Sequence, residues 1–369
     1  MDDNRIQKVA DILVNYSLKV KKGENVILAS DIEGKPLALE VYKLLVQNGA
    51  GEIRLKLGSY EFDEAFFKYA TTEQLKNFPK ISDFETKNTD CVIRISAPTN
   101  TRALSSIDQS KIALYSKTTQ SIQDYRVEKT RWVITQYPTN AQAQEADMSL
   151  DEYQGFVFKA ITDVDWQKMF KEQETLRNLL DQTKIVKIKA DMTDLTLDIT
   201  GRKAENAGGE FNMPDGEVFT SVIENSADGY ITYSYPALFH GREFQNVRLE
   251  FKKGKVVKAL ADKNEKDLNS ILDTDSGGRF IGELGIGNNF AIKKFTKNIL
   301  FDEKIGGSIH IALGRGYKKT LSKNISAIHW DMIKDLRVPA SAEASARQGG
   351  ELWFDDKLVQ KDGKWMIKM

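Results

Sequence analysis

Three histidines are the residues of this chain best suited to acid–base or metal chemistry, and all lie in its second half: His240, His310 and His329. Histidine is the commonest metal ligand, and its ordinary pKa lies near neutral pH. His310 and His329 lie close together in the sequence, each inside a run that alternates apolar and polar residues. The search for a catalytic or metal site therefore begins with these two runs.

The first run, residues 306–314, alternates as a β-strand does. Successive side chains of a strand point to opposite faces, so His310 shares its face with Ser308 and Ala312. The other face is apolar and should pack in the core through Ile309, Ile311 and Leu313. Small neighbours leave room beside His310 for an ion or a substrate, although the pattern also suits a structural histidine.

The second run, residues 326–333, repeats this alternation. His329 and Asp331 fall on one face and are neighbours if the segment is extended. The opposite face carries Ile328, Trp330 and Met332. Such a His-X-Asp pair can bind a metal ion through imidazole nitrogen and carboxylate oxygen. It can equally be a histidine oriented by its own carboxylate, or an exposed polar face.

Three glutamates lie among turn residues. Glu217 follows Asn-Met-Pro-Asp-Gly, a turn that should set it at the start of a strand. Glu283 is flanked by glycines, which permit close approach of the backbone to a ligand. Glu303 lies in Leu-Phe-Asp-Glu-Lys, ahead of His310. Taken alone, each of the three is more simply an exposed surface acid.

Other chemistries lack their motifs. The chain has no His-Glu-X-X-His, no Gly-X-Ser-X-Gly elbow and no phosphate loop of the Gly-X4-Gly-Lys-Ser/Thr type. Its one cysteine, Cys91, lies in an apolar run, which excludes cysteine zinc fingers and predicts a buried strand residue. Basic and acidic residues each number 53, giving zero net charge. Nucleic-acid-binding proteins usually carry a basic excess, so no nucleic-acid partner is expected.

Composition also indicates a compartment. One cysteine cannot form an internal disulfide, which favours a reducing environment. The first residues are acidic where a signal peptide is basic, and no apolar stretch follows them. No run approaches the ~18 apolar residues of a membrane-spanning helix. We therefore expect a cytoplasmic protein with no membrane partner.

The elements that must hold these residues fall into two parts, of which the first alternates helices and strands. Short apolar runs of strand character lie at residues 26–29, 53–57, 92–95 and 132–135. Between the first two, a helix should begin at Pro36 and end at Asn48-Gly49. Strand, helix and strand over this length form a βαβ unit and imply a parallel sheet. The N-terminal part is therefore predicted to be an open α/β sheet domain.

Residues 149–182 look helical, and beyond them the pattern changes. Residues 184–189 and 195–199 alternate with period two, and glycine turns recur after them, which is typical of antiparallel β structure. A chain of 369 residues is long enough for two domains. We expect an N-terminal α/β domain at 1–183 and a C-terminal mixed α+β domain at 184–369 that carries the candidate site.

Four segments in order resemble the thermophilic aminopeptidase family of metallopeptidases, which includes aminopeptidases T, S and PepS. They are Asn-Met-Pro-Asp-Gly-Glu-Val-Phe (212–219), Gly-Glu-Leu-Gly-Ile-Gly-Asn-Asn (282–289), Leu-Phe-Asp-Glu-Lys-Ile-Gly-Gly-Ser-Ile-His (300–310) and Ala-Ile-His-Trp-Asp (327–331). Further similarity at 137–139, at 144–153 and near the C-terminus extends the resemblance to nearly the whole chain. Several spaced motifs in a fixed order are far more specific than any single residue.

The resemblance implies an aminopeptidase that acts on peptides with a free N-terminus and uses two divalent ions of zinc, cobalt or manganese. By motif, it assigns metal binding to Glu217, Glu283, Glu303, His310, His329 and Asp331. Tyr317, in Gly-Arg-Gly-Tyr, is implied to lie near the ions and to hydrogen-bond the reacting carbonyl. Family members have an α/β N-terminal domain and a C-terminal metal domain, and they form homodimers.

Within that ligand set, two adjacent ions need a bridging carboxylate, and Glu283 is our choice. Two such ions can activate water and polarise the scissile carbonyl, while Tyr317 would stabilise the oxyanion. Glu217 or Glu283 is the candidate general base. Two other functions stay open: a different two-metal amide hydrolase, such as a dipeptidase or an amidase, and a non-enzymatic protein that binds a small molecule with its N-terminal domain.

Overall fold

The computed structural model describes residues 4–239, 241–338 and 349–369. The chain divides into two compact units. The first unit contains Met1–Asp163 and Gly209–Pro214, and the second contains Val164–Gly208 and Asp215–Met369. All seven residues proposed for the site belong to the second unit by their positions in the sequence.

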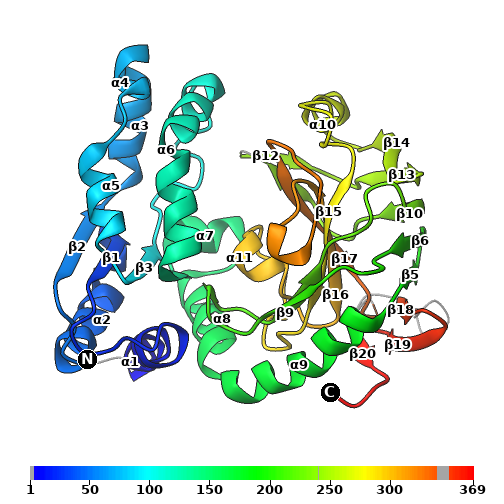
Figure 1. The fold of residues 1–369 in the computed structure, drawn as a ribbon, viewed down its shortest axis with the longest axis horizontal. Coiled ribbons are helices and arrows are strands. Elements are labelled where there is room, and N and C mark those ends of the chain that lie inside the picture. The colour runs from blue at the N-terminus through cyan, green and yellow to red at the C-terminus, as the bar shows by residue number, and fades with distance from the viewer. Residues whose placement is uncertain (1–3, 240, 339–348) are drawn as a thin grey trace. The chain divides into compact units, whose positions relative to one another are not determined.

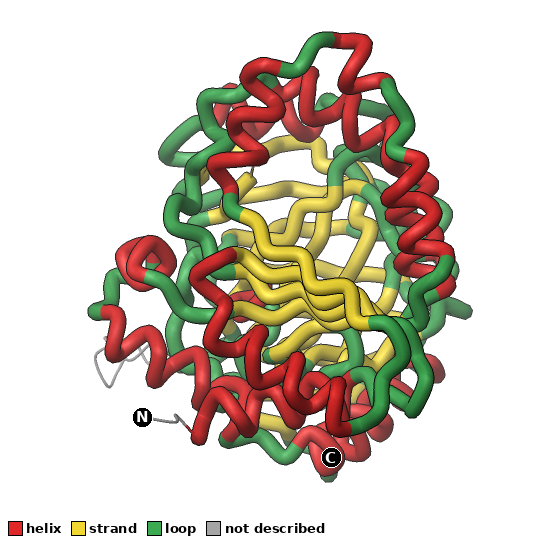
Figure 2. Tube along the Cα trace, turned by 90° about the vertical axis from the view of Figure 1, so that its left-hand side faces the viewer, coloured by secondary structure: helices red, strands yellow, loops and turns green. Residues whose placement is uncertain are grey.

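The first unit is built on a five-stranded parallel sheet, seen with its flanking helices in Figures 1 and 2. The strand order is β2-β1-β3-β4-β8. Their bounds are β1 (Val26–Asp31), β2 (Ile53–Gly58), β3 (Cys91–Ser96), β4 (Arg131–Gln136) and β8 (Asn212–Met213). The parallel pairing of β1 with β2 confirms the βαβ unit that the sequence predicts.

The helix between those strands, α2 (Lys35–Gln47), ends as its sequence indicates. Pro36 lies in the first turn, where a helix has no use for its N–H. Gly49 follows with φ of 71°, a conformation that glycine adopts without strain. The other helical segments of this unit are α1 (Asn4–Asp11) with the π-helical turn Ile12–Ser17, the 3-10 turn Ile32–Gly34, α3 (Tyr60–Tyr69), α4 (Thr72–Lys76), α5 (Lys80–Lys87), α6 (Gln109–Lys129), α7 (Asn140–Glu145) and α8 (Leu150–Thr162).

The second unit is built on two antiparallel sheets and a two-stranded pair. The larger sheet has the order β14-β13-β10-β6-β5-β18-β19-β20. Its strands are β5 (Ile185–Ala190), β6 (Thr193–Asp198), β10 (Asp228–Thr232), β13 (Arg248–Lys252), β14 (Lys255–Leu260), β18 (Glu351–Phe354), β19 (Lys357–Lys361) and β20 (Lys364–Trp365). β11 (Ala237–Phe239) pairs with β12 (Arg242–Phe244).

The smaller sheet carries the site and has the order β17-β16-β15-β9-β7. Its strands are β7 (Ala204–Ala207), β9 (Glu217–Thr220), β15 (Ile281–Gly287), β16 (Ser308–Gly314) and β17 (His329–Asp335). Every neighbouring pair in it is antiparallel. The antiparallel β structure expected in the second half of the chain is thus confirmed.

The helices of the second unit are few among the described residues: α9 (Trp166–Gln182), α10 (Glu265–Leu272), α11 (Ile299–Asp302) and the 3-10 turn Lys318–Thr320. α9 packs against β7 and β9 of the smaller sheet and so belongs with the second unit. For that reason the division between units falls before α9, at Asp163, whereas the sequence pattern suggests a boundary after it, near residue 183.

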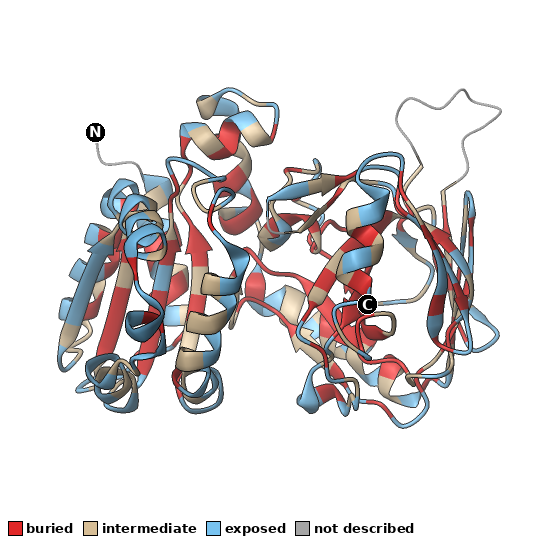
Figure 3. Cartoon of the chain, turned by 90° about the horizontal axis from the view of Figure 1, so that it is seen from above, coloured by how far each residue is buried: buried red, intermediate tan, exposed pale blue. Residues whose placement is uncertain are grey.

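Both sheets of the second unit contribute to one hydrophobic core, and Figure 3 shows buried residues, in red, concentrated along the strands. The apolar residues that alternate along β16 and β17 belong to this core: Ile309, Ile311, Leu313, Trp330 and Met332. The alternation predicted for both strands is therefore correct. Its consequence is that His310, His329 and Asp331 share the opposite face.

Two smaller expectations can also be compared with the structure. Cys91 is fully buried in β3, as its apolar surroundings predict. Burial raises the pKa of its thiol to about 11, which makes it a poor nucleophile at neutral pH. Within the described ranges, no helix is long and apolar enough to cross a membrane.

Candidate metal centre

Strand register brings three of the candidate side chains together. Ala312 in β16 pairs with Glu283 of β15 on one side and with Asp331 of β17 on the other. Two residues along the same strand, His310 lies opposite Gly285. Side chains two apart on a strand share a face, so the small residue Ala312 leaves space between two carboxylates and beside an imidazole.

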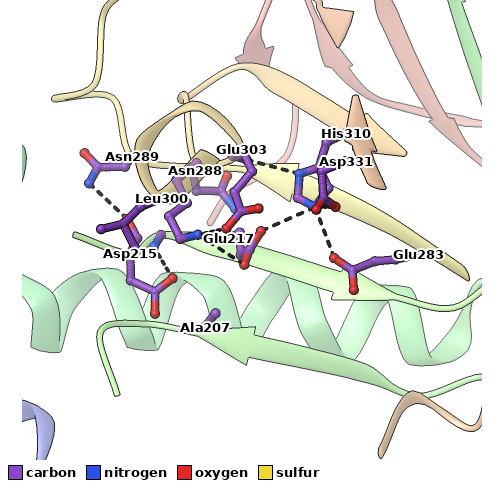
Figure 4. Close-up of polar contacts among 12 residues, drawn as sticks. Ala207, Asp215, Glu217, Glu283, Asn288, Asn289, Leu300, Glu303, His310 and Asp331 are labelled. Atoms are coloured by element: carbon purple, nitrogen blue, oxygen red, sulfur yellow. Dashed lines mark hydrogen bonds and ion pairs between the residues drawn. The ribbon is translucent and has the colours of Figure 1, made fainter. Parts of the chain in front are cut away.

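The acidic and imidazole groups converge on that space (Figure 4). His310 Nε2 lies 3.1 Å from Glu283 Oε1 and 3.5 Å from Glu217 Oε2. It lies 4.0 Å from Asp331 Oδ1, and His329 Nε2 approaches that same oxygen at 3.5 Å. Three sets each have ligand atoms within 4.8 Å of one another: Glu217, Glu283 and His310; Glu283, His329 and Asp331; Glu303, His310 and Asp331.

Both histidines are oriented by backbone carbonyls. Nδ1 of His310 lies 3.2 Å from the Glu303 carbonyl oxygen, and Nδ1 of His329 lies 2.6 Å from that of Arg315. A carbonyl can only accept, so Nδ1 donates in each case. The lone pair of each neutral ring is then on Nε2, which faces the carboxylates. This is the arrangement in which proteins usually present histidine to a metal ion.

Gly285 provides the space that His310 occupies. A Cβ added at Gly285 would lie 2.0 Å from Cε1 and 2.1 Å from Nε2 of the imidazole. The sequence predicts that glycine near Glu283 allows the backbone to approach a bound molecule. In the structure, Gly285 instead allows the backbone of β15 to approach the ring of His310, a candidate metal-binding residue.

The loop that carries Glu303 is anchored by its neighbour Asp302. The buried carboxylate of Asp302 accepts hydrogen bonds from the N–H of Thr296 at 2.7 Å, from its hydroxyl at 2.9 Å and from the N–H of Asn298 at 2.8 Å. Burial raises the pKa of Asp302 to about 8, although these bonds oppose the shift. The anchored turn ends α11 and directs Glu303 toward the cluster, as Figure 4 shows.

The turn before Glu217 is also fixed. Gly216 has φ of 113°, which a residue with a side chain rarely adopts. Its carbonyl accepts from the N–H of Asn288 at 2.7 Å, and the Asp215 carbonyl accepts from Nδ2 of Asn289 at 3.0 Å. Glu217 is then the first residue of β9, where the sequence predicts it.

Three buried carboxylate oxygens in this cluster have no hydrogen-bond partner among the described residues: Glu217 Oε2, Glu283 Oε2 and Asp331 Oδ1. Leaving a buried polar atom unsatisfied is energetically unfavourable. Divalent cations bind carboxylate oxygen and imidazole nitrogen. The cluster therefore fits a metal centre, and it contradicts the simpler interpretation of these glutamates as surface acids.

The charges of the cluster perturb one another strongly. Burial raises the pKa of Glu217 to about 7, against the opposing charge of Lys304. Burial favours the neutral ring of His310, but its hydrogen bond to Glu283 and the other carboxylates raise the pKa to about 10. Burial likewise opposes charge on His329, and Asp331 raises its pKa to about 10. Without a cation, protonated imidazoles offset part of the negative charge of the carboxylates.

Tyr317 lies at the edge of this cluster. Its ring centroid is 5.4 Å from that of His329 and 5.6 Å from that of Phe219. Burial, and then the carboxylates of Glu283 and Asp331, raise the pKa of its phenol, so the hydroxyl keeps its proton and can donate it. The side chain is 42% exposed, which leaves it accessible to a bound molecule.

The structure thus brings together the six residues assigned by resemblance, with Tyr317 beside them. His240, the third histidine, lies outside the described residues. Lys304 was missed: its side chain is fully buried, and its ammonium lies 3.6 Å from Glu217 Oε1 and contacts Glu303. Its position next to Glu303 in the sequence could have indicated that it belongs to the site. The alternation of apolar and polar residues, however, does not show that a lysine side chain points inward.

Comparison with known proteins agrees with this geometry. The family model described as thermophilic metalloprotease (M29) matches residues 2–365. Aminopeptidase 2 of Geobacillus stearothermophilus is 23% identical over 88% of this chain and 86% of its own. Aminopeptidase AmpS of Bacillus subtilis is 22% identical over 90% of this chain and 89% of its own. Wild-type AmpT from Thermus thermophilus superposes with a TM-score of 0.83 at 20% identity, covering 99% of each chain, which shows that the fold is shared.

Proposed function

The chain belongs to the thermophilic metalloprotease (M29) family, and from that premise we propose that it is an aminopeptidase that uses two divalent ions. The family is one of metal-dependent peptidases, and the similar chains named above are aminopeptidases. The observation that carries the proposal is the convergence of four carboxylates and two imidazoles, in three sets whose ligand atoms each lie within 4.8 Å of one another. Three of those carboxylates have a buried oxygen that accepts no hydrogen bond from the described residues.

The proposed ligands are Glu217, Glu283, Glu303, His310, His329 and Asp331. Glu283 belongs to two of the three close-packed sets, which supports it as the carboxylate shared between two ions. When bound, two divalent ions of zinc, cobalt or manganese would activate water and polarise the scissile carbonyl. The backbone carbonyls of Glu303 and Arg315 hold the two imidazoles in the tautomer that such ions require.

Two protein groups are proposed to act on the substrate directly. The phenol of Tyr317 stays protonated and is accessible, so it can donate a hydrogen bond to the oxygen that becomes negative as the peptide bond is attacked. A general base must exchange a proton near neutral pH. Glu217 and Glu283, which are proposed to lie beside the ions, are the candidates for that role.

Selection for a free N-terminus separates this proposal from other two-metal amide hydrolases. The purified protein should be assayed on aminoacyl-anilides, on the same anilides with acetylated N-termini, and on peptides of increasing length. We expect hydrolysis of the free forms, loss of hydrolysis on acetylation, and release of one residue at a time from longer peptides. Equal cleavage of acetylated substrates would indicate an amidase, cleavage of dipeptides alone a dipeptidase, and no cleavage of any of them a binding protein.

The cytoplasm is the proposed location, which the single buried cysteine supports. A homodimer is the proposed assembly. The first unit exposes large apolar side chains, with Phe62, Tyr69, Ile81 and Phe84 each at least 68% exposed, and exposed apolar patches often mark protein interfaces. Light scattering should give twice the mass of one 41.7 kDa chain. The mass of a single chain at micromolar concentration would contradict the dimer.

A further inference from the structure

Lys304 is the feature of the cluster that the proposed ligand set does not use. Its side chain is fully buried, although lysine is rarely buried without paired charges. The ammonium lies 3.6 Å from Glu217 Oε1 and contacts the Glu303 carboxylate directly. The buried carboxylate of Asp215 adds a third negative neighbour.

The contacts of Lys304 divide the cluster unequally. Among the described residues, its ammonium forms ion pairs with Glu217 and Glu303. No such pair joins it to the set of Glu283, His329 and Asp331, whose ligand atoms lie within 4.8 Å of one another. The two carboxylates that pair with the lysine belong to the other two sets, Glu217 with Glu283 and His310, and Glu303 with His310 and Asp331. An ion bound through either of those glutamates therefore lies beside the ammonium, whereas the set of Glu283, His329 and Asp331 forms no ion pair with it.

We propose that Lys304 is a fixed positive charge that makes the two ion positions unequal, weakening the binding of an ion held through Glu217 or Glu303 relative to an ion held by Glu283, His329 and Asp331. The inference rests on the two-ion proposal above and adds the order in which the two ions bind. A cation that binds through Glu217 or Glu303 must share the negative charge of that glutamate with an ammonium and is repelled by it. The first ion should thus occupy the position of His329 and Asp331, and the second should bind more weakly.

The alternative is that Lys304 only positions Glu217 and Glu303, and the two roles predict opposite signs. If the lysine repels the second ion, its replacement by an uncharged side chain of similar length should tighten that ion. If it mainly positions the two glutamates, the same replacement should loosen it. Lys304→Met is the natural variant, because methionine fills a buried space flexibly and carries no charge.

Lys334 offers a matched control. It is also a buried lysine, 6% exposed, and its ammonium donates to the Asp191 carbonyl at 2.8 Å. It lies on β17 close to Asp331. Side chains two apart on a strand share a face, so Ile333 shares the face of Asp331 and Lys334 points to the other face. Lys334→Met therefore removes a buried ammonium without changing the charge that faces the cluster.

The test is calorimetric titration of metal-free protein with zinc and with manganese, together with metal stoichiometry after desalting. Wild type should bind two ions in separate steps and retain only the first on desalting. In Lys304→Met, the second dissociation constant should fall at least about tenfold, because charges a few ångströms apart in a partly screened site interact strongly. The first should change much less, and Lys334→Met should leave both unchanged.

Each other outcome has a distinct meaning. Equal affinities in wild type, or weaker binding of the second ion in Lys304→Met, would overturn the role given to Lys304. Binding of no ion to wild type would instead overturn the proposed function. If Lys304→Met does not fold by circular dichroism, Lys304→Gln takes its place, because it removes the charge and keeps a hydrogen-bond donor for the two glutamates. Tighter binding of the second ion in that variant supports the proposal, and unchanged or weaker binding overturns it.

Discussion

Gly285→Ala is the smallest change that should dismantle the site. Gly285 and His310 face each other across β15 and β16, and the new Cβ would lie 2.0 Å from Cε1 of the imidazole. Carbon atoms in contact lie ~3.5–4.0 Å apart, so the ring must shift by roughly 1.5 Å or the strands must separate. The ring is fully buried, and its Nδ1 is tied to the Glu303 carbonyl. Any shift of the ring therefore strains or breaks that hydrogen bond and moves Nε2 away from its position among the carboxylates.

Two effects should follow from that displacement. Overpacking a core position typically costs ~1–3 kcal/mol of stability. A misplacement of ~1 Å in a catalytic group can cost about 100-fold in rate. We therefore expect a folded protein with a lower Tm, reduced metal content and kcat lower by at least ~100-fold.

The assay is a comparison of kcat, metal content and Tm in four proteins. Gly155→Ala is the control for adding a methyl group, because Gly155 lies in α8 with no atom within 4 Å of the new Cβ. It should keep full activity and stability. In Gly285→Ala combined with His310→Ala, removing the ring should relieve the clash and restore Tm without restoring metal or activity. Wild-type kcat and metal content in Gly285→Ala would refute the assignment of His310 to the site.

The remaining predictions concern ligands, the phenol and protons. His329→Ala and Glu283→Gln should each lower kcat by at least ~100-fold with the fold intact, because each removes a proposed ligand; unchanged turnover and metal content in either would exclude it from the site. Tyr317→Phe should keep both ions and Tm but lose ~10²–10³-fold in kcat, with KM changing less; a drop in Tm with kcat preserved would make Tyr317 a packing residue. Metal binding should release protons at neutral pH, since His310 and His329 have pKa values near 10 without an ion and must bind as neutral rings. The affinity for metal should therefore weaken as the pH falls below 10. Calorimetry in buffers with different ionisation enthalpies should give the number of protons released. A binding enthalpy that does not depend on the buffer would contradict proton release.

Local patterns in the sequence are sufficient to predict the strands of the site. Alternation with period two assigns Ile309 and Ile311 to the core and His310 to the other face, and the structure agrees. The turn before Glu217 can likewise be predicted from Pro214, Asp215 and Gly216. These features depend only on residues a few positions apart, so a single segment contains the information.

The rest depends on which segments meet in space. Nothing local pairs Ala312 with both Glu283 and Asp331, or sets Gly285 against His310, because strand register is decided by the whole sheet. Lys304 was missed for the same reason: part of the charge that pairs with its buried ammonium comes from Glu217, which is distant in sequence. Resemblance to a family predicts the ligand set. The spacing of residues alone predicts only that each glutamate is an exposed surface acid.

Ions held by this cluster should be required for hydrolysis of peptides at the N-terminus. Elemental analysis should be combined with hydrolysis of aminoacyl-anilides before chelation, after chelation, and after return of zinc, cobalt or manganese. We predict up to two ions per chain, loss of activity when they are removed, and recovery in proportion to the ions restored. Full activity in protein shown to be free of metal would contradict the account.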